Sequence, residues 1–458
     1  GDSGPAEGST PGGDTPPPGA HKHNHSNKRY AYKNENNGLV VTRNEINGLN
    51  LNSIYTSDVG EIEHEGPDVV QLTDSNGTEF NVPNGGSVAS VLIKKTSSDS
   101  GSLHADSIEV LIKEDANINS FKFTLDGKQK EASKILSATE IDKINVKEGL
   151  DLLNTGTIGS TISTELFNPR SATNAYSSHD SQTRFVYDSP IGVIISRNEL
   201  TVGSDLSSHS SFTGTPADDI SGPEFALVNN VDLDLATGEA VVGVRRTIKD
   251  YYNTGFQLII SGSTSASEKR ILTIDNDGTP LTTATDSTIN PTDLIFKLLE
   301  LNTGIDLDGD GTNGFSITQT DIVNQGFNNE LNRKVSITDN NEIILSREVL
   351  PTGELNKNNI TPSLLRHDNV NGPGFIVLAD SSGGESFTKN SSQTILGARI
   401  VKTEEISPLA PPRIERAELF VSSENEISVI KFDLDGTNSG IATYSETEGL
   451  ATSQIKSI

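Results

Sequence analysis

One short pattern occurs three times in this sequence: GLVVTRNE at residues 38–45, GVIISRNE at 192–199 and EIILSRE at 342–348. Each copy is an apolar run followed by Ser or Thr and then Arg. Runs of Val, Ile and Leu next to turn-forming residues are typical of β-strands. The spacing is nearly constant, since Arg197 lies 154 residues after Arg43 and Arg347 lies 150 residues after Arg197. We therefore expect one β-rich module to be repeated three times.

Further markers accompany the pattern in the same order in every copy. An arginine precedes it, and a Gly-Pro pair with an apolar run follows it. A strand that ends in basic residues and a strand pair that ends in Asp-Gly come next. The markers are Arg29, Arg184 and Arg333; Gly66-Pro67, Gly222-Pro223 and Gly372-Pro373; residues 91–96, 244–247 and 400–403; and Asp126-Gly127, Asp277-Gly278 and Asp435-Gly436. Their common order indicates an old duplication.

Each module is predicted to be mainly β with one helix at its end. The short apolar runs and the many turn residues favour two facing antiparallel sheets. Residues 290–301 differ, because Asn290 is a good helix cap, Pro291 suits the first turn, and an apolar run follows. Residues 140–153 are the counterpart in the first copy, and both stretches end in Leu-Asn-Thr-Gly, where Gly is expected to stop the helix.

The expected fold class is therefore mainly β. We predict three tandem β-sandwich-like modules, each closed by a short helix, at residues 29–167, 184–320 and 333–458. Residues 1–28 are rich in Pro and Gly and are predicted to form a disordered, flexible leader, because they contain too little apolar surface to fold. The leader also holds His21, His23 and His25, which would share one face of an extended chain and suit Zn, Ni or Cu; a polar linker is the alternative.

The composition narrows the class of protein. With 35 Lys and Arg against 63 Asp and Glu, the net charge is −28, which disfavours nucleic acid as a partner. The same acidity attracts divalent cations, or simply keeps an extracellular protein in solution. The chain begins with Gly and has no Met and no Cys, so a processed form or a fragment is expected. Removal of a signal peptide is the simplest explanation, and it predicts a secreted or cell-surface protein. No apolar run of about 18 residues is present, so no membrane span is expected.

One loop carries recognisable chemistry. Residues 306–314 read DLDGDGTNG and follow the helix predicted at 290–301. Three alternate aspartates followed by Gly place oxygen atoms around Ca²⁺ in loops of the EF-hand type, and the next carbonyl supplies a further ligand. The predicted metal-binding residues are Asp306, Asp308, Asp310, Thr312 and Asn313. Calcium is the predicted cofactor, and an acidic turn that stays solvated is the alternative.

This loop, with the helix end before it, resembles the EF-hand-like and dockerin-like calcium loops of secreted bacterial repeat-containing surface proteins, including cyanobacterial ones. The resemblance covers about 12 of the 458 residues. It implies a calcium site in an extracellular protein. The full pattern has a bidentate Glu at position twelve, where this chain has Ile317, and the nearest downstream acid is Asp321. The site is therefore expected to be weaker, or to be completed by another strand.

Catalytic patterns are missing from the sequence. It contains no G-x-S-x-G elbow, phosphate-binding P-loop, H-E-x-x-H pair or dinucleotide fingerprint. We therefore predict that the chain is not an enzyme but an extracellular structural protein: a subunit of a surface layer, filament or sheath, or the rod of an adhesin. Two other classes stay open, a fibre that binds a host protein or glycan and a β-sandwich enzyme that acts on polysaccharides.

The predicted partners follow from this class. Self-association into a polymer or lattice is expected, and a cell-surface glycan is a second candidate partner. Residues 29–45 follow the leader directly and are predicted to pair with the sheet edge of a neighbouring subunit.

Overall fold

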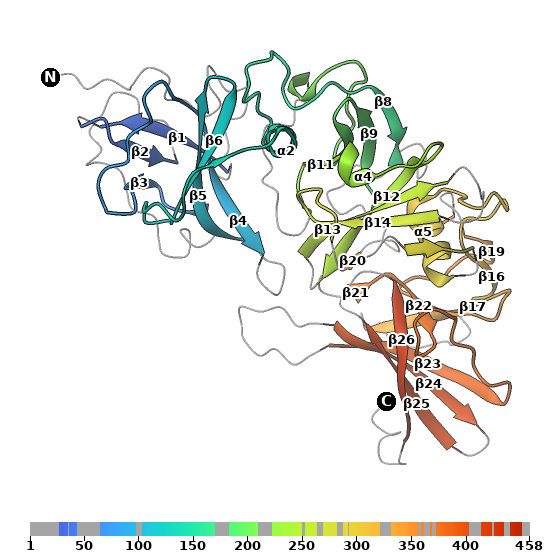
Figure 1. The fold of residues 1–458 in the computed structure, drawn as a ribbon. Helices are drawn as coiled ribbons and strands as arrows, with labels where there is room; N and C mark the ends of the chain where they lie inside the picture. Colours follow the sequence, from blue (N-terminus) through green and yellow to red (C-terminus); the bar gives the residue numbers. More distant parts are fainter. Residues whose placement is uncertain are drawn as a thin grey trace. The chain divides into compact units, whose positions relative to one another are not determined.

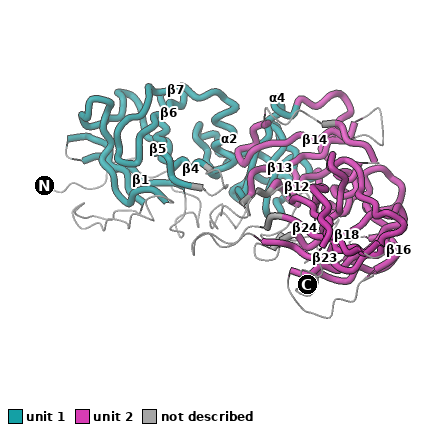
Figure 2. Tube along the Cα trace, turned by 90° about the horizontal axis from the view of Figure 1, so that it is seen from below, with its two compact units in different colours: residues 1–165, 187–233 teal, residues 166–186, 234–458 magenta. Residues whose placement is uncertain are grey.

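A computed structural model describes residues 27–43, 65–97, 103–169, 183–208, 222–262, 269–320, 331–368, 372–402 and 414–450, apart from short gaps at 35, 250–251, 282–286, 292, 356–358, 361–366, 424–425 and 435–439. Nearly all of the predicted leader, with its three histidines, lies outside the described residues. The chain forms two compact units (Figure 2). Unit 1 consists of residues 1–165 and 187–233, and unit 2 of residues 166–186 and 234–458.

The first part of unit 1 is an antiparallel sheet of seven strands, which we call the N-terminal sheet (Figure 1). The strand order is β3-β2-β1-β4-β5-β6-β7. The strands are β1 (Lys28–Lys33), β2 (Leu39–Thr42), β3 (Val69–Gln71), β4 (Ser87–Ser97), β5 (Leu103–Glu114), β6 (Asn117–Phe123) and β7 (Lys134–Ile135). Alternate residues of each strand point to one side and bury a core around Val91, Val110 and Phe123.

Two four-stranded sheets follow along the chain, in the orders β11-β10-β9-β8 and β12-β13-β14-β15. The first has β8 (Thr164–Phe167), β9 (Phe185–Ser189), β10 (Gly192–Ser196) and β11 (Phe225–Asn229), and the second has β12 (Ala240–Lys249), β13 (Tyr252–Ser261), β14 (Lys269–Ile274) and β15 (Ser287–Ile289). In the sequence, the short element η2 (Leu206–Ser208) lies between β10 and β11, and α4 (Asn230–Leu233) lies between β11 and β12. Every residue of β10 and β11 is buried, which explains why both strands read as unbroken apolar runs.

The C-terminal part of unit 2 is a closed barrel of β17, β18, β22, β26, β25, β24 and β23. It closes because β17 (Asn332–Thr338) pairs with both β18 (Ile343–Ser346) and β23 (Gln393–Lys402). The other barrel strands are β22 (Phe375–Ala379), β24 (Ile414–Ser423), β25 (Glu426–Leu434) and β26 (Ile441–Gly449). The strands β16 (Ser316–Gln319) and β19 (Gly353–Glu354) extend the sheet beside β17, and β20 (His367–Asp368) pairs with β21 (Gly372–Pro373).

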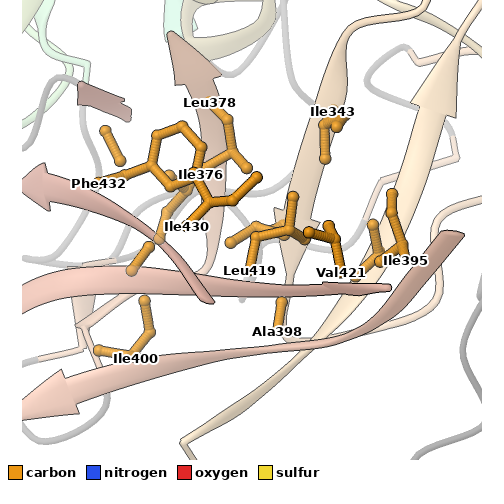
Figure 3. Packing of buried hydrophobic residues seen from close by; sticks show 14 residues of the cluster. Ile343, Ile376, Leu378, Ile395, Ala398, Ile400, Leu419, Val421, Ile430 and Phe432 are labelled. Carbon is orange, nitrogen blue, oxygen red and sulfur yellow. The ribbon is translucent and has the colours of Figure 1, made fainter. Parts of the chain in front are cut away.

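The barrel interior is filled by alternate apolar residues of its strands. Figure 3 shows Leu419, Val421 and Ile430 directed into the same core as Ile376 and Ile343. The sequence predicted two facing sheets here, whereas the structure has one closed sheet. The reason is β26, which pairs antiparallel with β25 and parallel with β22 and so leaves neither of these strands with a free edge.

The predicted mainly β class is confirmed, and the strand order also recurs. The order β3-β2-β1 is repeated as β11-β10-β9 and as β22-β18-β17, and β4-β5-β6 is repeated as β12-β13-β14 and β23-β24-β25. The ranges of the three modules stay a prediction. The two compact units divide the chain at other places, and the boundaries near residues 186 and 233 fall within the predicted second module.

Helix α2 (Ala138–Glu148) has two packing sides within unit 1. Ile141 belongs to a cluster on the outer side of the N-terminal sheet with Leu92 and Leu111. The helix also packs against β11, and Lys143 Nζ forms an ion pair with Asp232 at 2.9 Å. The helix therefore joins the N-terminal sheet to the β10–β11 strands.

Helix α5 (Leu294–Thr303) does the same within unit 2. Phe296 and Leu299 belong to a cluster with residues of β13 and β14. Leu298 lies in another cluster with Phe315 and with Phe375 of the barrel strand β22. The almost unbroken apolar run that predicted this helix is explained by these two buried sides, because a helix packed on one side would show a single stripe.

The helix ends differ from those predicted. The cap of α5 is Asp293, so Pro291 lies before the helix. α2 ends at Gly149, so the Leu-Asn-Thr-Gly of residues 153–156 lies in the following loop and does not end a helix. The third copy continues into strand β26 up to Gly449. Glu448 and Gly449, which match Glu148 and Gly149 at the end of α2 in sequence, are therefore part of a strand, and the described residues show no closing helix there.

The predicted pairing of residues 29–45 with a neighbouring subunit is wrong for the described part, residues 29–43 without 35. The strand β1 pairs with β2 and β4, and β2 also pairs with β3, so this hairpin lies inside the sheet. Arg29 is 1 % exposed and donates to the carbonyl oxygen of Glu65, and Arg43 donates to that of Gly66 at 2.9 Å. The repeated arginines therefore bind the hairpin to the Gly-Pro segment. Burial lowers the pKa of Arg29 to about 10, and the positive charge of Arg43 acts in the same direction.

Candidate metal centre

The predicted calcium loop begins where α5 ends. Gly304 ends the helix with φ 68°, and its N–H donates to the carbonyl oxygen of Glu300. The chain then passes through Asp306, Asp308 and Asp310 and reaches strand β16 at Ser316. The loop therefore connects α5, which packs on both sides, to the first strand that pairs with the barrel strand β17.

Aspartate side chains hold the backbone of this loop. Asp306 accepts from the N–H groups of Gly309 at 2.7 Å and Gly311 at 2.9 Å through its two oxygens. Asp308 accepts from the N–H of Asp310 at 3.0 Å. Asp310 accepts from both the N–H and the hydroxyl of Thr312, at 2.7 Å and 2.6 Å. Each aspartate keeps oxygen lone pairs for other contacts, since an ionised carboxylate can accept about four bonds.

A residue outside the predicted set completes the acidic group. Carboxylate oxygens of Glu300, Asp306 and Asp308 lie within 4.8 Å of one another. Glu300 is only 3 % exposed, and its Oε1 accepts from the N–H of Leu307 at 2.9 Å. The sequence analysis missed it because Glu300 lies in the last turn of the helix, ahead of the loop motif. The signal was present, since a lone acid interrupts an otherwise apolar helix face.

The loop does not bring all the predicted residues into this group. Asp310 is not among the three carboxylates that cluster, and it is turned toward Thr312. Asn313 Oδ1 is buried and accepts no hydrogen bond. Ile317, at the position where an EF-hand has its Glu, is 2 % exposed and lies in the apolar cluster under α5. Glu300 therefore supplies the third carboxylate that position twelve does not. Asp321 lies outside the described residues.

The close carboxylates raise the pKa of two members of the group. Burial raises the pKa of Glu300 to about 7, and the negative charges of Asp308 and Asp310 act in the same direction. Burial likewise raises the pKa of Asp308, together with the charges of Asp310 and Asp306. By contrast, the hydrogen bonds from Thr312 lower the pKa of Asp310. A bound divalent cation would stabilise the ionised forms of Glu300 and Asp308.

One positive side chain lies near the group. Burial lowers the pKa of Lys269, on strand β14, and the negative charges of Asp308 and Glu300 oppose this shift. Lys269 therefore offsets part of the negative charge.

A second loop in the same chain has the same backbone scaffold, but of the acids it keeps only the equivalent of Asp306. After α2, Asp151 accepts from the N–H of Gly156 at 2.6 Å, as Asp306 does from Gly311. Asn145 accepts from the N–H of Leu152 at 3.1 Å, seven residues on, as Glu300 does from Leu307. Each pair of equivalent residues is 155 positions apart. The structure therefore aligns Asp306 with Asp151. The Leu-Asn-Thr-Gly motifs are 148 positions apart, so an alignment based on them is shifted by seven residues.

This alignment shows what is specific to the second loop. Neutral residues of the first loop are replaced by acids: Asn145 by Glu300, Leu153 by Asp308 and Thr155 by Asp310. The first loop keeps its Asp151 scaffold without these acids, so they are not needed to form the turn. Three added carboxylates at one place destabilise a metal-free loop by mutual repulsion. Hard oxygen ligands of this kind suit Ca²⁺ or Mg²⁺.

Comparisons with known proteins do not identify a family. No family model matches the chain, and no curated protein matches it. Among solved structures, the Bacillus megaterium YpeB C-terminal domain matches with 12 % identity over 48 % of this chain and 94 % of that chain, at a TM-score of 0.10. Apo prolyl oligopeptidase B from Galerina marginata matches with 9 % identity over 94 % of this chain and 45 % of that chain, at a TM-score of 0.14. The V. cholerae biofilm matrix protein Bap1 matches with 10 % identity over 94 % of this chain and 79 % of that chain, at a TM-score of 0.11. Scores this low establish no shared fold.

Among the residues that the structure describes, no helix is long and apolar enough to cross a membrane.

Proposed function

We propose that this chain is a non-enzymatic extracellular structural protein, a rod of β-modules in which Ca²⁺ stabilises the joint formed by α5. The observation that supports it is the position of the acidic group. Glu300 belongs to the helix that packs on both the β12–β15 sheet and the barrel, and Asp306 and Asp308 belong to the loop that continues into the barrel strands. A cation bound by all three ties the end of the helix to the loop.

The repulsion between these carboxylates destabilises the metal-free loop, and a bound cation would compensate for it. The joint at α2 is built on the same scaffold and has neutral residues where the second joint has Glu300, Asp308 and Asp310, so the module does not require a metal to fold. A cation at the second joint would make this joint more rigid than the first. A difference in rigidity between the two joints suits a surface protein that bears load or polymerises, since the shape of such a protein depends on the angles between its modules.

Calcium titration of the full chain tests the metal part. Addition of Ca²⁺ at about 100 times its Kd should stabilise the fold that contains α5 by about 2.7 kcal/mol, because binding to the folded state alone adds RT ln(1 + [L]/Kd). The double variant Asp306→Asn, Asp308→Asn should lose this response. The matched control is Asp151→Asn, in the loop that lacks the cluster, and it should keep the response. Equal behaviour of the two variants would contradict the proposal.

Imaging of the purified protein tests the structural role. Ordered filaments or sheets that form with Ca²⁺ and disperse with a chelator would support it. A protein that stays monomeric under both conditions, or that cleaves a polysaccharide until a single carboxylate is replaced, would contradict it and favour one of the other two classes.

A further inference from the structure

A buried lysine lies on the face of the β12–β15 sheet that α5 and the acidic loop cover. Lys269 begins strand β14, is 4 % exposed and is paired directly with Ile289 of β15. Directly paired residues of neighbouring strands share a face of the sheet. Ile289 packs in one cluster with Ile271 of β14 and with Leu307, the loop residue between the first two aspartates. The side of the sheet that carries Lys269 is therefore the side on which the loop rests.

The charges of the acidic group act on this lysine. Burial lowers the pKa of Lys269, and the charges of Asp308 and Glu300 are among those that oppose this shift. A charged side chain is rarely buried to this extent unless opposite charges stabilise it. The acidic group is therefore an electrostatic partner of Lys269 as well as a candidate metal site.

The N-terminal sheet has an apolar residue at the place of Lys269. Phe123 at the end of β6 and Ile274 at the end of β14 are equivalent, since each pairs with the residue six positions further on. Ile118 lies five residues before Phe123, and Lys269 lies five residues before Ile274. Both pairs of strands are in register between these positions. Ile118 is therefore the counterpart of Lys269.

The lysine and the acids replace apolar or neutral residues together. Ile118 is 0 % exposed and packs in the cluster that holds Leu152 of the first loop. At the second joint this position is Lys269, and the helix position of Asn145 is Glu300. Either charge alone would be unfavourable in a buried place, whereas opposite charges near each other offset part of that cost. The paired exchange indicates that the lysine belongs to the acidic group.

We propose that Lys269 is the internal counter-ion of the acidic group and that it sets the preference of this group for divalent cations. Three ionised carboxylates and one ammonium group leave two net negative charges, which one divalent cation neutralises. The ammonium group repels a trivalent cation more strongly than a divalent one, because the Coulomb energy scales with the charge. This inference rests on the metal site of the proposed function and adds the residue that determines its selectivity.

Replacement of the lysine by the residue of the N-terminal sheet tests the selectivity. Lys269→Ile should raise the affinity of the full chain for Ca²⁺ about tenfold and that for Tb³⁺ about 30-fold, since the repulsion that is lost is about 1.5 times larger for a trivalent ion. Calorimetric titration with each ion measures both affinities. Binding that persists in the double variant Asp306→Asn, Asp308→Asn is subtracted as background. Ile118 shows that isoleucine fits this position, so the variant is expected to fold.

Arg270→Met is the matched control. Arg270 follows Lys269 on β14, lies on the other face of the strand and forms an ion pair with Glu239 at 2.9 Å. Its replacement removes the same charge from the chain but not from the acidic group, so the ratio of the two affinities should stay unchanged. Equal rises for both ions in Lys269→Ile, a lower affinity in that variant, or the same change in Arg270→Met would overturn the role of Lys269 in selectivity.

A measurement without metal separates this inference from the proposed function. In a chelator, urea unfolding of Lys269→Ile, Glu300→Gln and the double variant gives the coupling between the two charges. The double variant should be more stable than the sum of the single effects predicts, because neither charge is then left without the other. Lys269→Ile combined with Asn145→Gln is the control cycle and should be additive.

The two measurements fail in different ways. An additive cycle for Lys269 and Glu300, in a protein that binds Ca²⁺, would overturn the counter-ion and leave the proposed function standing. A coupled cycle in a protein that binds neither ion at this group would overturn the metal site, and the selectivity with it.

Discussion

At the scale of single residues, the most informative comparison is between Asn145 and Glu300. Both lie in the last turn of a helix, both are buried, and both accept from the N–H seven residues on. Only Glu300 adds a negative charge beside Asp306 and Asp308. A buried acid beside two other carboxylates lowers the stability of a metal-free protein compared with a neutral amide. It would raise the stability of the same protein with a bound cation. This opposition distinguishes a binding site from an ordinary buried hydrogen bond.

Glu300→Gln should therefore stabilise the metal-free protein and abolish the response to Ca²⁺. The pKa of Glu300 is raised to about 7 from 4.5, so the stability that the protonated acid retains is fully present below about pH 4.5 and is lost as the pH rises through 7. The loss amounts to at most about 3.4 kcal/mol, at 1.36 kcal/mol for each pKa unit. Urea unfolding at pH 5 and pH 8 in a chelator measures it, and the advantage of the variant should appear mainly at pH 8. Asn145→Gln is the matched control and should show no such dependence on pH. A variant that is less stable than the parent at pH 8 would contradict this account.

Gly314 offers a second test at this scale. It adopts φ 97°, and a Cβ atom there would lie 2.3 Å from the carbonyl oxygen of Lys297. Gly311 has a similar φ of 88° but nothing within 4 Å of its Cβ position. Both Gly→Ala changes strain the backbone by about 1–2 kcal/mol, and Gly314→Ala adds a clash with the backbone of α5. We expect thermal unfolding to show a clearly larger loss for Gly314→Ala. Equal losses would mean that the loop is not seated against the helix as described.

Among the elements, the strands were predictable from the sequence and the helix ends were not. Apolar runs bounded by turn residues mark β2, β10 and β18 directly, because a fully buried strand needs no other signal. The end of α2 was misplaced because Leu-Asn-Thr-Gly occurs twice, once at a helix end and once in a loop. The spacing of Asp306 and Asp308 predicted that they contribute to one acidic group, but Glu300 comes from the preceding helix, and no loop motif contains it. The closed barrel was missed for a similar reason, since the parallel pairing of β26 with β22 is a long-range contact.

Helix α2 depends on its first turn more than α5 does. Ser137 Oγ accepts from the N–H of Glu140, and the Glu140 carboxylate accepts from the N–H of Ser137, whereas Asp293 makes no side-chain cap bond to α5. Lys134 and Ser137 lower the pKa of Glu140 to about 2. A depressed carboxyl pKa stabilises the fold above the unfolded value of 4.5, and this contribution is lost as the pH falls from 4.5 through 2.

Ser137→Ala should destabilise the fold that contains α2 by about 1 kcal/mol at neutral pH. The capping bonds also require an ionised Glu140, so the difference between variant and parent should shrink as the pH falls toward 2. Denaturant unfolding across pH 2 to 7 measures the effect. Asp293→Ala in α5 is the comparison and should cost less, because no cap bond is lost there. A larger loss in α5 than in α2 would contradict the assignment of the caps.

At the scale of the molecule, the helices explain why the compact units do not coincide with the predicted modules. α2 packs on the N-terminal sheet and on β11, so these parts cluster in unit 1. α5 packs on the β12–β15 sheet and on the barrel, so these cluster in unit 2. The modules predicted from the sequence begin near the repeated strand pattern. The compact units instead keep together the sheets that one helix connects.

This organisation predicts that metal binding changes the stiffness of unit 2 rather than its fold. The chain has no Cys, so single spin labels can be attached at introduced cysteines without any competing site. One label pair, Leu281→Cys with Ser445→Cys, spans the α5 joint, from the β12–β15 sheet to the barrel, at two exposed positions. Pulsed electron–electron double resonance measures the distance between the two labels. Its distribution should be broad in a chelator and narrower with Ca²⁺, because the cation links the end of α5 to the loop before β16. The control pair, Thr388→Cys in the connection between β22 and β23 with Ser445→Cys on β26, does not span α5 and should not respond. If both pairs sharpen equally, the cation acts on the barrel as a whole, and if neither does, the acidic loop does not control the joint.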